Sequence, residues 1–216
     1  MPTIPYKTSD GKRVPGVTTI LSRFKESGGL IHWAWDLGIQ GKDYRTERDA
    51  AAGSGTLAHA MIEAAIHERE FERPADADDD MWEKAQAGFA AYEKWADQSN
   101  LQVILTEAHL VSEKYRFGGT PDAIGLVSGE LCILDWKTSN ALYYDNLIQV
   151  VSYKALYEEN YPADPITGGI HICRFSKEHA DFEHRHFASS LEEPWRAFVL
   201  MRELYDITTA LKKRVR

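Results

Sequence analysis

The stretch Gly-Gly-Thr-Pro-Asp-Ala-Ile-Gly-Leu-Val-Ser-Gly-Glu-Leu-Cys-Ile-Leu-Asp-Trp-Lys occupies residues 118–137 and predicts two short strands joined by a Ser-Gly turn. Asp122 starts the first strand, and Asp135 and Lys137 end the second. Because side chains alternate along a strand, we expect Asp135 and Lys137 to project together and Trp136 to point the other way. A buried acid and base are unfavourable unless they pair or bind a metal, which makes this hairpin a candidate site.

Outside the hairpin, apolar periodicity predicts further helices and strands. The expected strands are 101–111, 114–127, 130–137, 168–175 and 182–187, and the main expected helices are 30–37, 57–66, 81–98, 146–157 and 194–213. The first three strands have short connections and favour an antiparallel meander, after which a helix crosses over to another strand. We therefore predict an α/β fold with a mixed central sheet in the order αβββαβ and additional N-terminal and C-terminal helices.

Two helix starts are also predicted from capping residues. A short helix is expected near Gly16, capped by Thr18 or Thr19. Gly53-Ser54-Gly55-Thr56 is expected to break the chain, with Thr56 capping the helix that follows.

Length and composition indicate a single globular domain. The chain has 216 residues and is 44% hydrophobic, which is sufficient for one sizeable core. We expect a mainly helical part over 1–100, a sheet over 101–190 and a C-terminal helix over 191–216. No apolar run approaches the roughly 20 residues that a membrane span needs, and the N-terminus lacks a signal-like apolar stretch. A cytoplasmic location is expected.

Cysteine usage and charge exclude several classes of protein. Cys132 and Cys173 lie in apolar strand-like runs without a C-x-x-C pair, so we expect buried free thiols rather than a zinc ribbon or an iron–sulfur cluster. The net charge of −8 argues against a nucleic-acid coat. It leaves a nuclease open, because carboxylates gathered at a metal site contribute to that total.

The hairpin residues suit metal-assisted hydrolysis of a phosphodiester. Asp122 and Asp135 offer oxygen ligands of the kind that Mg²⁺ or Mn²⁺ prefers, and the main-chain carbonyl of Trp136 is a further hard ligand. A bound metal polarises a phosphoryl oxygen and lowers the pKa of water, while Lys137 can orient that water, deprotonate it or stabilise developing charge. Glycosidases also use paired carboxylates but have no need of the lysine.

Several other residues are weaker candidates when each is taken alone. His59 lies on a helix that is apolar around its circumference, where a histidine is more often core than ligand. Trp33 and Trp35 offer stacking platforms for bases, although core packing is the more common role. Arg45 and Arg48 suit phosphate contacts or simply a solvated helix face.

Two further candidates flank the hairpin. Gln149 and Tyr153 are four residues apart on a predicted helix, so they share a face from which both can hydrogen-bond a phosphate or a base. Glu107 lies in the first expected strand, where a role near the metal and an exposed strand position are equally open.

Together these motifs resemble those of the PD-(D/E)xK nuclease superfamily. Gly118 to Asp122, Asp135 to Thr138, and Gln149 to Tyr153, preceded by His59, occur in the same order. Within the superfamily they resemble the RecB-like exonuclease branch, which includes phage recombination exonucleases and the mitochondrial genome maintenance exonuclease. The resemblance covers about His59 to Tyr153 and implies a restriction-endonuclease-like core.

The resemblance also implies roles for individual residues. Asp122 and Asp135 would be metal carboxylates, Lys137 the catalytic lysine, and His59 with the Trp136 carbonyl further metal ligands. The substrate-contacting residues would be Gln149, Tyr153, Thr138, Arg45 and Arg48, and Glu107 would be an additional metal ligand or a supporting residue. The cofactor would be Mg²⁺, with Mn²⁺ able to substitute. The four cysteines of some relatives that bind an iron–sulfur cluster are missing.

The expected function is a metal-dependent DNA exonuclease acting in phage recombination, repair or end processing. The expected partners are a DNA strand end and a separate annealing or single-strand-binding protein. A structure-specific or restriction-like endonuclease is an alternative with the same chemistry. A non-catalytic DNA-binding module is another, but a degenerate version should have lost Asp135 or Lys137.

Overall fold

The computed structural model describes residues 4–25, 28–139, 141–175 and 182–215. The helices in these ranges are α1 (Val17–Ser22), α2 (Gly28–Ile39), α3 (Tyr44–Ile66), α4 (Asp79–Gln98), α5 (Tyr144–Asn160) and α6 (Glu192–Arg214). The strands are β1 (Gln102–Thr106), β2 (Leu110–Ser112), β3 (Phe117–Gly119), β4 (Ala123–Val127), β5 (Glu130–Thr138), β6 (Gly169–Phe175) and β7 (Phe182–Phe187).

A five-stranded sheet in the order β1-β4-β5-β6-β7 forms the centre of the molecule. Strands β1, β4 and β5 form an antiparallel meander, β5 pairs with β6 in parallel, and β7 is antiparallel to β6. The helix α5 makes the crossover between the two parallel strands. This mixed α/β sheet confirms the predicted fold class and places β5 at its middle.

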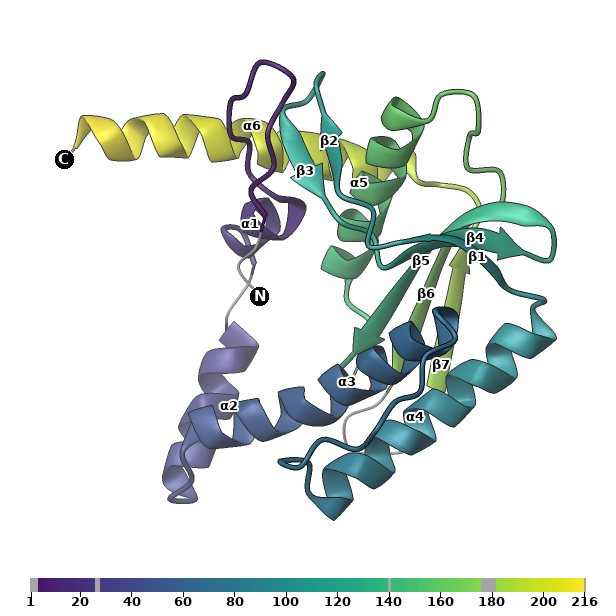
Figure 1. Ribbon diagram of the computed structural model, residues 1–216. Coiled ribbons are helices and arrows are strands. Elements are labelled where there is room, and N and C mark those ends of the chain that lie inside the picture. Colours follow the sequence, from purple (N-terminus) through teal and green to yellow (C-terminus); the bar gives the residue numbers. More distant parts are fainter. Residues whose placement is uncertain (1–3, 26–27, 140, 176–181, 216) are drawn as a thin grey trace.

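Helices cover both faces of this sheet (Figure 1). On one face Ile133 of β5 packs in a core with residues of α1, α5 and α6. On the other face Cys132 and Leu134 pack in a second core with residues of α3 and α4. The alternation along β5 thus divides its side chains between two helical layers, as expected for a strand buried on both faces.

The chain before β4 departs from the predicted long strands. β1 ends at Thr106, because Glu107 adopts a positive φ of 46° that stops regular pairing. The following residues form β2 and β3, a separate two-stranded sheet, instead of extending their neighbours. The expected strands 101–111 and 114–127 are therefore each divided by a turn.

Helix α3 continues through the glycines that were expected to break it. Gly55 faces the end of β5, where a Cβ atom would lie 2.4 Å from Oγ1 of Thr138. Gly53 similarly faces Met81, whose Cε would lie 2.5 Å from a Cβ atom. The glycines allow close packing of the helix, and its N-cap is Asp43 rather than Thr56. This correction matters because the same helix carries His59.

The cap of α1, the exposure of Trp35 and the state of the cysteines bear on three further predictions. The cap of α1 is Gly16, without a side-chain hydrogen bond, so the Thr18 or Thr19 cap is wrong. Trp35 is 61% exposed on α2, so its expected place in the core is wrong as well. Cys132 and Cys173 are both buried free thiols, as predicted.

Among the helices that the structure describes, none has the length and apolar character that crossing a membrane requires.

Candidate active site

Strand β5 directs its charged residues and Trp136 to opposite sides. Nζ of Lys137 lies 2.5 Å from Oδ2 of Asp135, whose carboxylate is 1% exposed. The indole of Trp136 instead packs edge-on against Tyr92 of α4, with ring centroids 5.1 Å apart. The alternation predicted from the sequence is therefore confirmed, and the aromatic contacts on the far side anchor the strand that carries the acid and the lysine.

Asp122 reaches the same strand from the residue just before β4. Its Oδ2 accepts a hydrogen bond of 2.8 Å from the main-chain N–H of Trp136. The register of the β4–β5 hairpin, with Ala123 opposite Leu134, brings Asp122 beside the end of β5. The two carboxylates of this hairpin are thus gathered around one short length of backbone.

Burial and mutual repulsion alter the protonation of these groups. Burial is the main cause that raises the pKa of Asp135 to about 6; Lys137 opposes this effect and Asp122 adds to it. Burial also raises the pKa of Asp122. Burial alone would lower the pKa of Lys137, but the two carboxylates raise it above its ordinary value. The centre therefore holds more negative charge than Lys137 neutralises.

His59 reaches the centre from α3, which the Gly55–Thr138 contact holds close to β5. The imidazole lies near the main chain of Trp136 and near Asp135 and Glu107. Burial lowers the pKa of His59, although Asp135 partly opposes that effect. The ring is therefore neutral at neutral pH, which is the form that can bind a metal.

His59, Asp122 and Trp136 line a cavity of about 210 Å³, here called the site cavity, whereas Asp135 and Lys137 lie beside it and not in its lining. Its lining residues are Thr56, His59, Ala60, Glu63, Ile66, Thr106, Glu107, Asp122 and Trp136. Glu63 was missed from the sequence, although it follows His59 by one helical turn and so shares its face. It pairs at 2.8 Å with the exposed Arg69.

Glu107 follows β1 rather than lying within a strand. Its main-chain N–H donates a 3.2 Å hydrogen bond to the carbonyl of Asp122, and its side chain lines the site cavity. The positive φ of 46° turns the chain at this point. Glu107 is exposed and also lines the same cavity as Asp122, so a role near the metal stays a prediction.

Gln149 and Tyr153 share a face of α5, and the Gln149 amide donates a 2.8 Å hydrogen bond to the Tyr153 hydroxyl. Tyr153 is 4% exposed, and its ring packs closely against Gly119 of β3. This approach requires glycine, because a Cβ atom at position 119 would lie only 2.7 Å from the ring. Burial, reinforced by Asp135, raises the pKa of Tyr153. Neither side chain lines the site cavity, but Tyr153 lies near Asp135, so a contact of this pair with substrate stays a prediction.

The remaining predicted residues lie at different distances from the centre. Thr138 ends β5 and packs against Gly55 of α3. Arg45 and Arg48 precede His59 on the same helix by about 21 Å and 17 Å along its axis, from a rise of about 1.5 Å per residue. The structure therefore does not bring the two arginines to the carboxylates.

The donor atoms fit a hard divalent cation. Asp122 gives one oxygen to Trp136 and Asp135 gives one to Lys137, so each carboxylate has a second oxygen for a cation. Such a cation would also neutralise the surplus negative charge. Among the residues that the structure describes, no three His, Cys, Asp or Glu side chains already stand in a complete metal-binding arrangement.

Comparison with protein families gives one match that spans most of the chain. A family model described as "PD-(D/E)XK nuclease superfamily" matches residues 7–210. No curated protein matches the sequence.

Solved structures give more distant matches. A candidate exonuclease from Eubacterium rectale is 12% identical, with a TM-score of 0.46 over 68% of this chain, and this chain spans 64% of its length. LHK-Exo in complex with dAMP is 15% identical, with a TM-score of 0.31 over 74% of this chain and 85% of its own. LHK-Exo is an alkaline exonuclease from Laribacter hongkongensis.

Proposed function

The chain belongs to the PD-(D/E)XK nuclease superfamily, and from this premise we propose that it is a divalent-metal-dependent deoxyribonuclease that degrades DNA from a strand end. The observation that carries the proposal is the meeting of Asp122, Asp135 and Lys137 around the end of β5. A protein that used this fold only to bind DNA would have no need of a buried acid and lysine in contact.

Asp122, Asp135, His59 and the carbonyl of Trp136 are the groups that would hold Mg²⁺ or Mn²⁺. When bound, such an ion supplies Lewis-acid polarisation of the phosphodiester and a more acidic water. Glu107 lines the same cavity and is a further candidate ligand or a support for Asp122.

The remaining groups act on charge and position. Lys137 places a positive charge beside Asp135, where it stabilises negative charge that develops on the attacked phosphate. Gln149 and Tyr153, which hydrogen-bond each other on α5, would contact the substrate strand and support the site, and Thr138 would contact the strand from the end of β5. Preorganised charge of this kind needs no rearrangement during the reaction.

The exonuclease mode and the biological setting rest on the resemblance to the RecB-like branch. We place the protein in DNA recombination, repair or end processing, as a single nuclease domain of the cytoplasm, with a separate annealing or single-strand-binding partner. An endonuclease with the same chemistry would use the same residues, so the products must distinguish the two.

The test is to incubate the protein with end-labelled single-stranded, duplex and circular DNA, with Mg²⁺, with Mn²⁺ or with EDTA, and to size the products. With either metal, we expect mononucleotides from linear DNA and no products from circular DNA. Cut circles would establish an endonuclease instead. Intact DNA under every condition, from a folded protein, would refute the enzyme assignment.

A further inference from the structure

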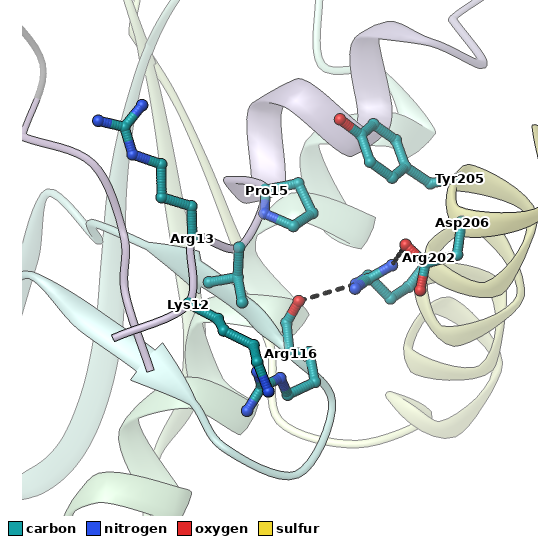
Figure 2. Close-up of a pocket in the computed structure, with 8 residues that line it drawn as sticks. Lys12, Arg13, Pro15, Arg116, Arg202, Tyr205 and Asp206 are labelled. Atoms are coloured by element: carbon teal, nitrogen blue, oxygen red, sulfur yellow. Dashed lines mark hydrogen bonds and ion pairs between the residues drawn. The ribbon is translucent and has the colours of Figure 1, made fainter. Parts of the chain in front are cut away.

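A second, larger cavity lies away from the candidate active site, between the N-terminal loop, the turn before β3 and helix α6 (Figure 2). Its volume is about 530 Å³, and we call it the basic cavity. Its lining residues are Lys12, Arg13, Val14, Pro15, Arg116, Arg202, Tyr205 and Asp206. The lining thus combines four cationic side chains with one carboxylate, in a chain whose net charge is −8.

Arg202 forms the inner wall of the basic cavity. The residue is only 9% exposed, and its Nε donates a 3.0 Å hydrogen bond to the carbonyl of Arg116. Its NH1 lies 2.5 Å from a carboxylate oxygen of Asp206, whose own side chain is 65% exposed. In the described part of the chain these contacts use Nε and NH1, which leaves NH2 for a ligand. A planar guanidinium fixed in this way suits a phosphate.

The other cations stand at the rim. Asp10 lies between two of them, 2.8 Å from Lys12 and 3.3 Å from Arg116. Arg13 is exposed and forms no ion pair with any described residue. Since exposed ion pairs contribute little to stability, these cations can exchange a carboxylate for a phosphate at low cost.

The basic cavity is fixed relative to the candidate active site. The main-chain N–H of Gly118 donates a 3.0 Å hydrogen bond to the carbonyl of Pro15, which ties the N-terminal loop to β3. Asp122 follows Arg116 by six positions in the chain, so the Cα atoms of these two residues are at most about 20 Å apart. That distance corresponds to about six base pairs along a duplex.

We propose that the basic cavity is a phosphate-binding site that holds the backbone of the nucleic-acid substrate while another part of the strand occupies the site cavity. The proposal rests on the function proposed above. Arg202 would provide the inner contact, and Lys12, Arg13 and Arg116 would neutralise phosphates at the rim.

The test compares Arg13→Glu with Lys94→Glu, which makes the same charge change at an exposed position on α4. Binding of a fluorescent single strand of about 20 nucleotides is measured by anisotropy in EDTA over a range of salt, so that metal and catalysis play no part. We expect Arg13→Glu to weaken binding about tenfold more than Lys94→Glu. In addition, Arg13→Ala should reduce the salt slope by about one.

Strands with a 5′-phosphate and with a 5′-hydroxyl distinguish the two possible sources of phosphate. A loss with both strands assigns the cavity to internal backbone phosphates, and a loss only with the phosphorylated strand assigns it to a terminal phosphate. Equal effects of Arg13→Glu and Lys94→Glu would overturn the proposal, because the cause would then be overall charge.

Cleavage separates this proposal from the proposed function. With metal, Arg13→Glu should slow degradation of the long strand more than Lys94→Glu does. A wild-type protein that cleaves nothing would refute the nuclease assignment alone, since the binding comparison in EDTA still decides the fate of the basic cavity.

Discussion

The two cavities differ in both charge and construction. The site cavity contains carboxylates and a neutral histidine, and close backbone packing sets its position through Gly55 and Thr138. The basic cavity has exposed arginine and lysine side chains at its rim, with the buried Arg202 as its one deeply fixed cation among the lining residues. Substitutions in the site cavity should therefore change both the cleavage rate and the stability of the fold. Substitutions at the rim of the basic cavity should change only the affinity for nucleic acid.

The contrast also explains how an acidic protein can act on a polyanion. The carboxylates would attract phosphate only after a cation has neutralised them. The basic cavity attracts phosphate without a metal. Net charge therefore describes neither cavity.

The strongest test of this contrast removes the acid at the centre of the site. Asp135→Asn keeps the size of the side chain but removes a metal ligand and the partner of Lys137, so we expect DNA cleavage to fall by about 10³-fold or more. The steady-state rate with Mg²⁺ measures the effect. Glu130→Gln, an exposed acid on the same strand, is the control and should retain wild-type activity. If the Asp135→Asn variant cleaves DNA at the wild-type rate, the assignment of the active site to Asp135 is wrong.

The second test concerns His59. His59→Ala should weaken binding of Mn²⁺ by at least about tenfold, because a metal ligand is lost. Isothermal titration with Mn²⁺ gives the affinity directly, without any need for cleavage. His32→Ala, on the exposed surface of α2, should titrate like the wild type. If both variants do so, His59 is a packing residue.

The third test uses pH. Since Asp135 has a pKa raised to about 6, cleavage below that pH should fall about tenfold per pH unit as the carboxylate takes up a proton. Stability should change in the opposite direction. A raised carboxyl pKa means that the folded state binds the proton more tightly, so wild-type protein should lose stability relative to Asp135→Asn as pH rises from 3.8 to about 6. Urea unfolding of both proteins in EDTA measures the difference, and a constant difference would contradict the burial of this acid.

The fourth test examines how tightly the site cavity is built. Gly55→Ala inserts a methyl group into Thr138, and overpacking of this kind destabilises proteins by about 1–3 kcal/mol. At Gly38 of α2 nothing lies within 4 Å of an added Cβ atom, so Gly38→Ala should instead stabilise by about 0.5–1 kcal/mol. Denaturant unfolding distinguishes the two signs. A neutral Gly55→Ala would show that α3 does not need this close approach.

The smallest effect is expected outside both cavities. Arg45 lies about 21 Å from His59 along α3, and exposed substitutions usually change stability by less than about 0.5 kcal/mol. The Arg45→Ala variant should therefore cleave a dinucleotide at the wild-type rate and unfold at the same denaturant concentration as the wild-type protein. A large loss of dinucleotide cleavage would show that the α3 N-terminus reaches the reacting strand.

Local pattern in the sequence was sufficient for the hairpin that carries the acids. Alternation predicted that Asp135 and Lys137 lie together with Trp136 opposite, because the period of a strand is set by its own backbone. The mixed sheet was also predicted, since short connections favour antiparallel pairing and a helix permits a parallel crossover. The features that could not be predicted from the sequence depend on tertiary contacts.

Gly53 and Gly55 show where prediction from local sequence fails. Glycine weakens an isolated helix, so a break was the reasonable prediction. Packing against Met81 and Thr138 reverses that preference, and neither partner can be identified from the glycines themselves. The basic cavity was missed for a related reason: Lys12, Arg116 and Arg202 are separated in the sequence, and the only dense basic run is the C-terminal one.

The tight turn between β4 and β5 has a consequence for how the protein folds. Ser128 and Gly129 both adopt a positive φ, of 51° and 86°, which suits a two-residue hairpin turn, and Val127 pairs directly with Glu130. Hairpins of this kind form in about 1–10 μs, whereas the parallel pairing of β5 with β6 must first close the long loop through α5. We therefore expect Asp122 and Asp135 to come together early in folding, and His59 to join them only when α3 docks.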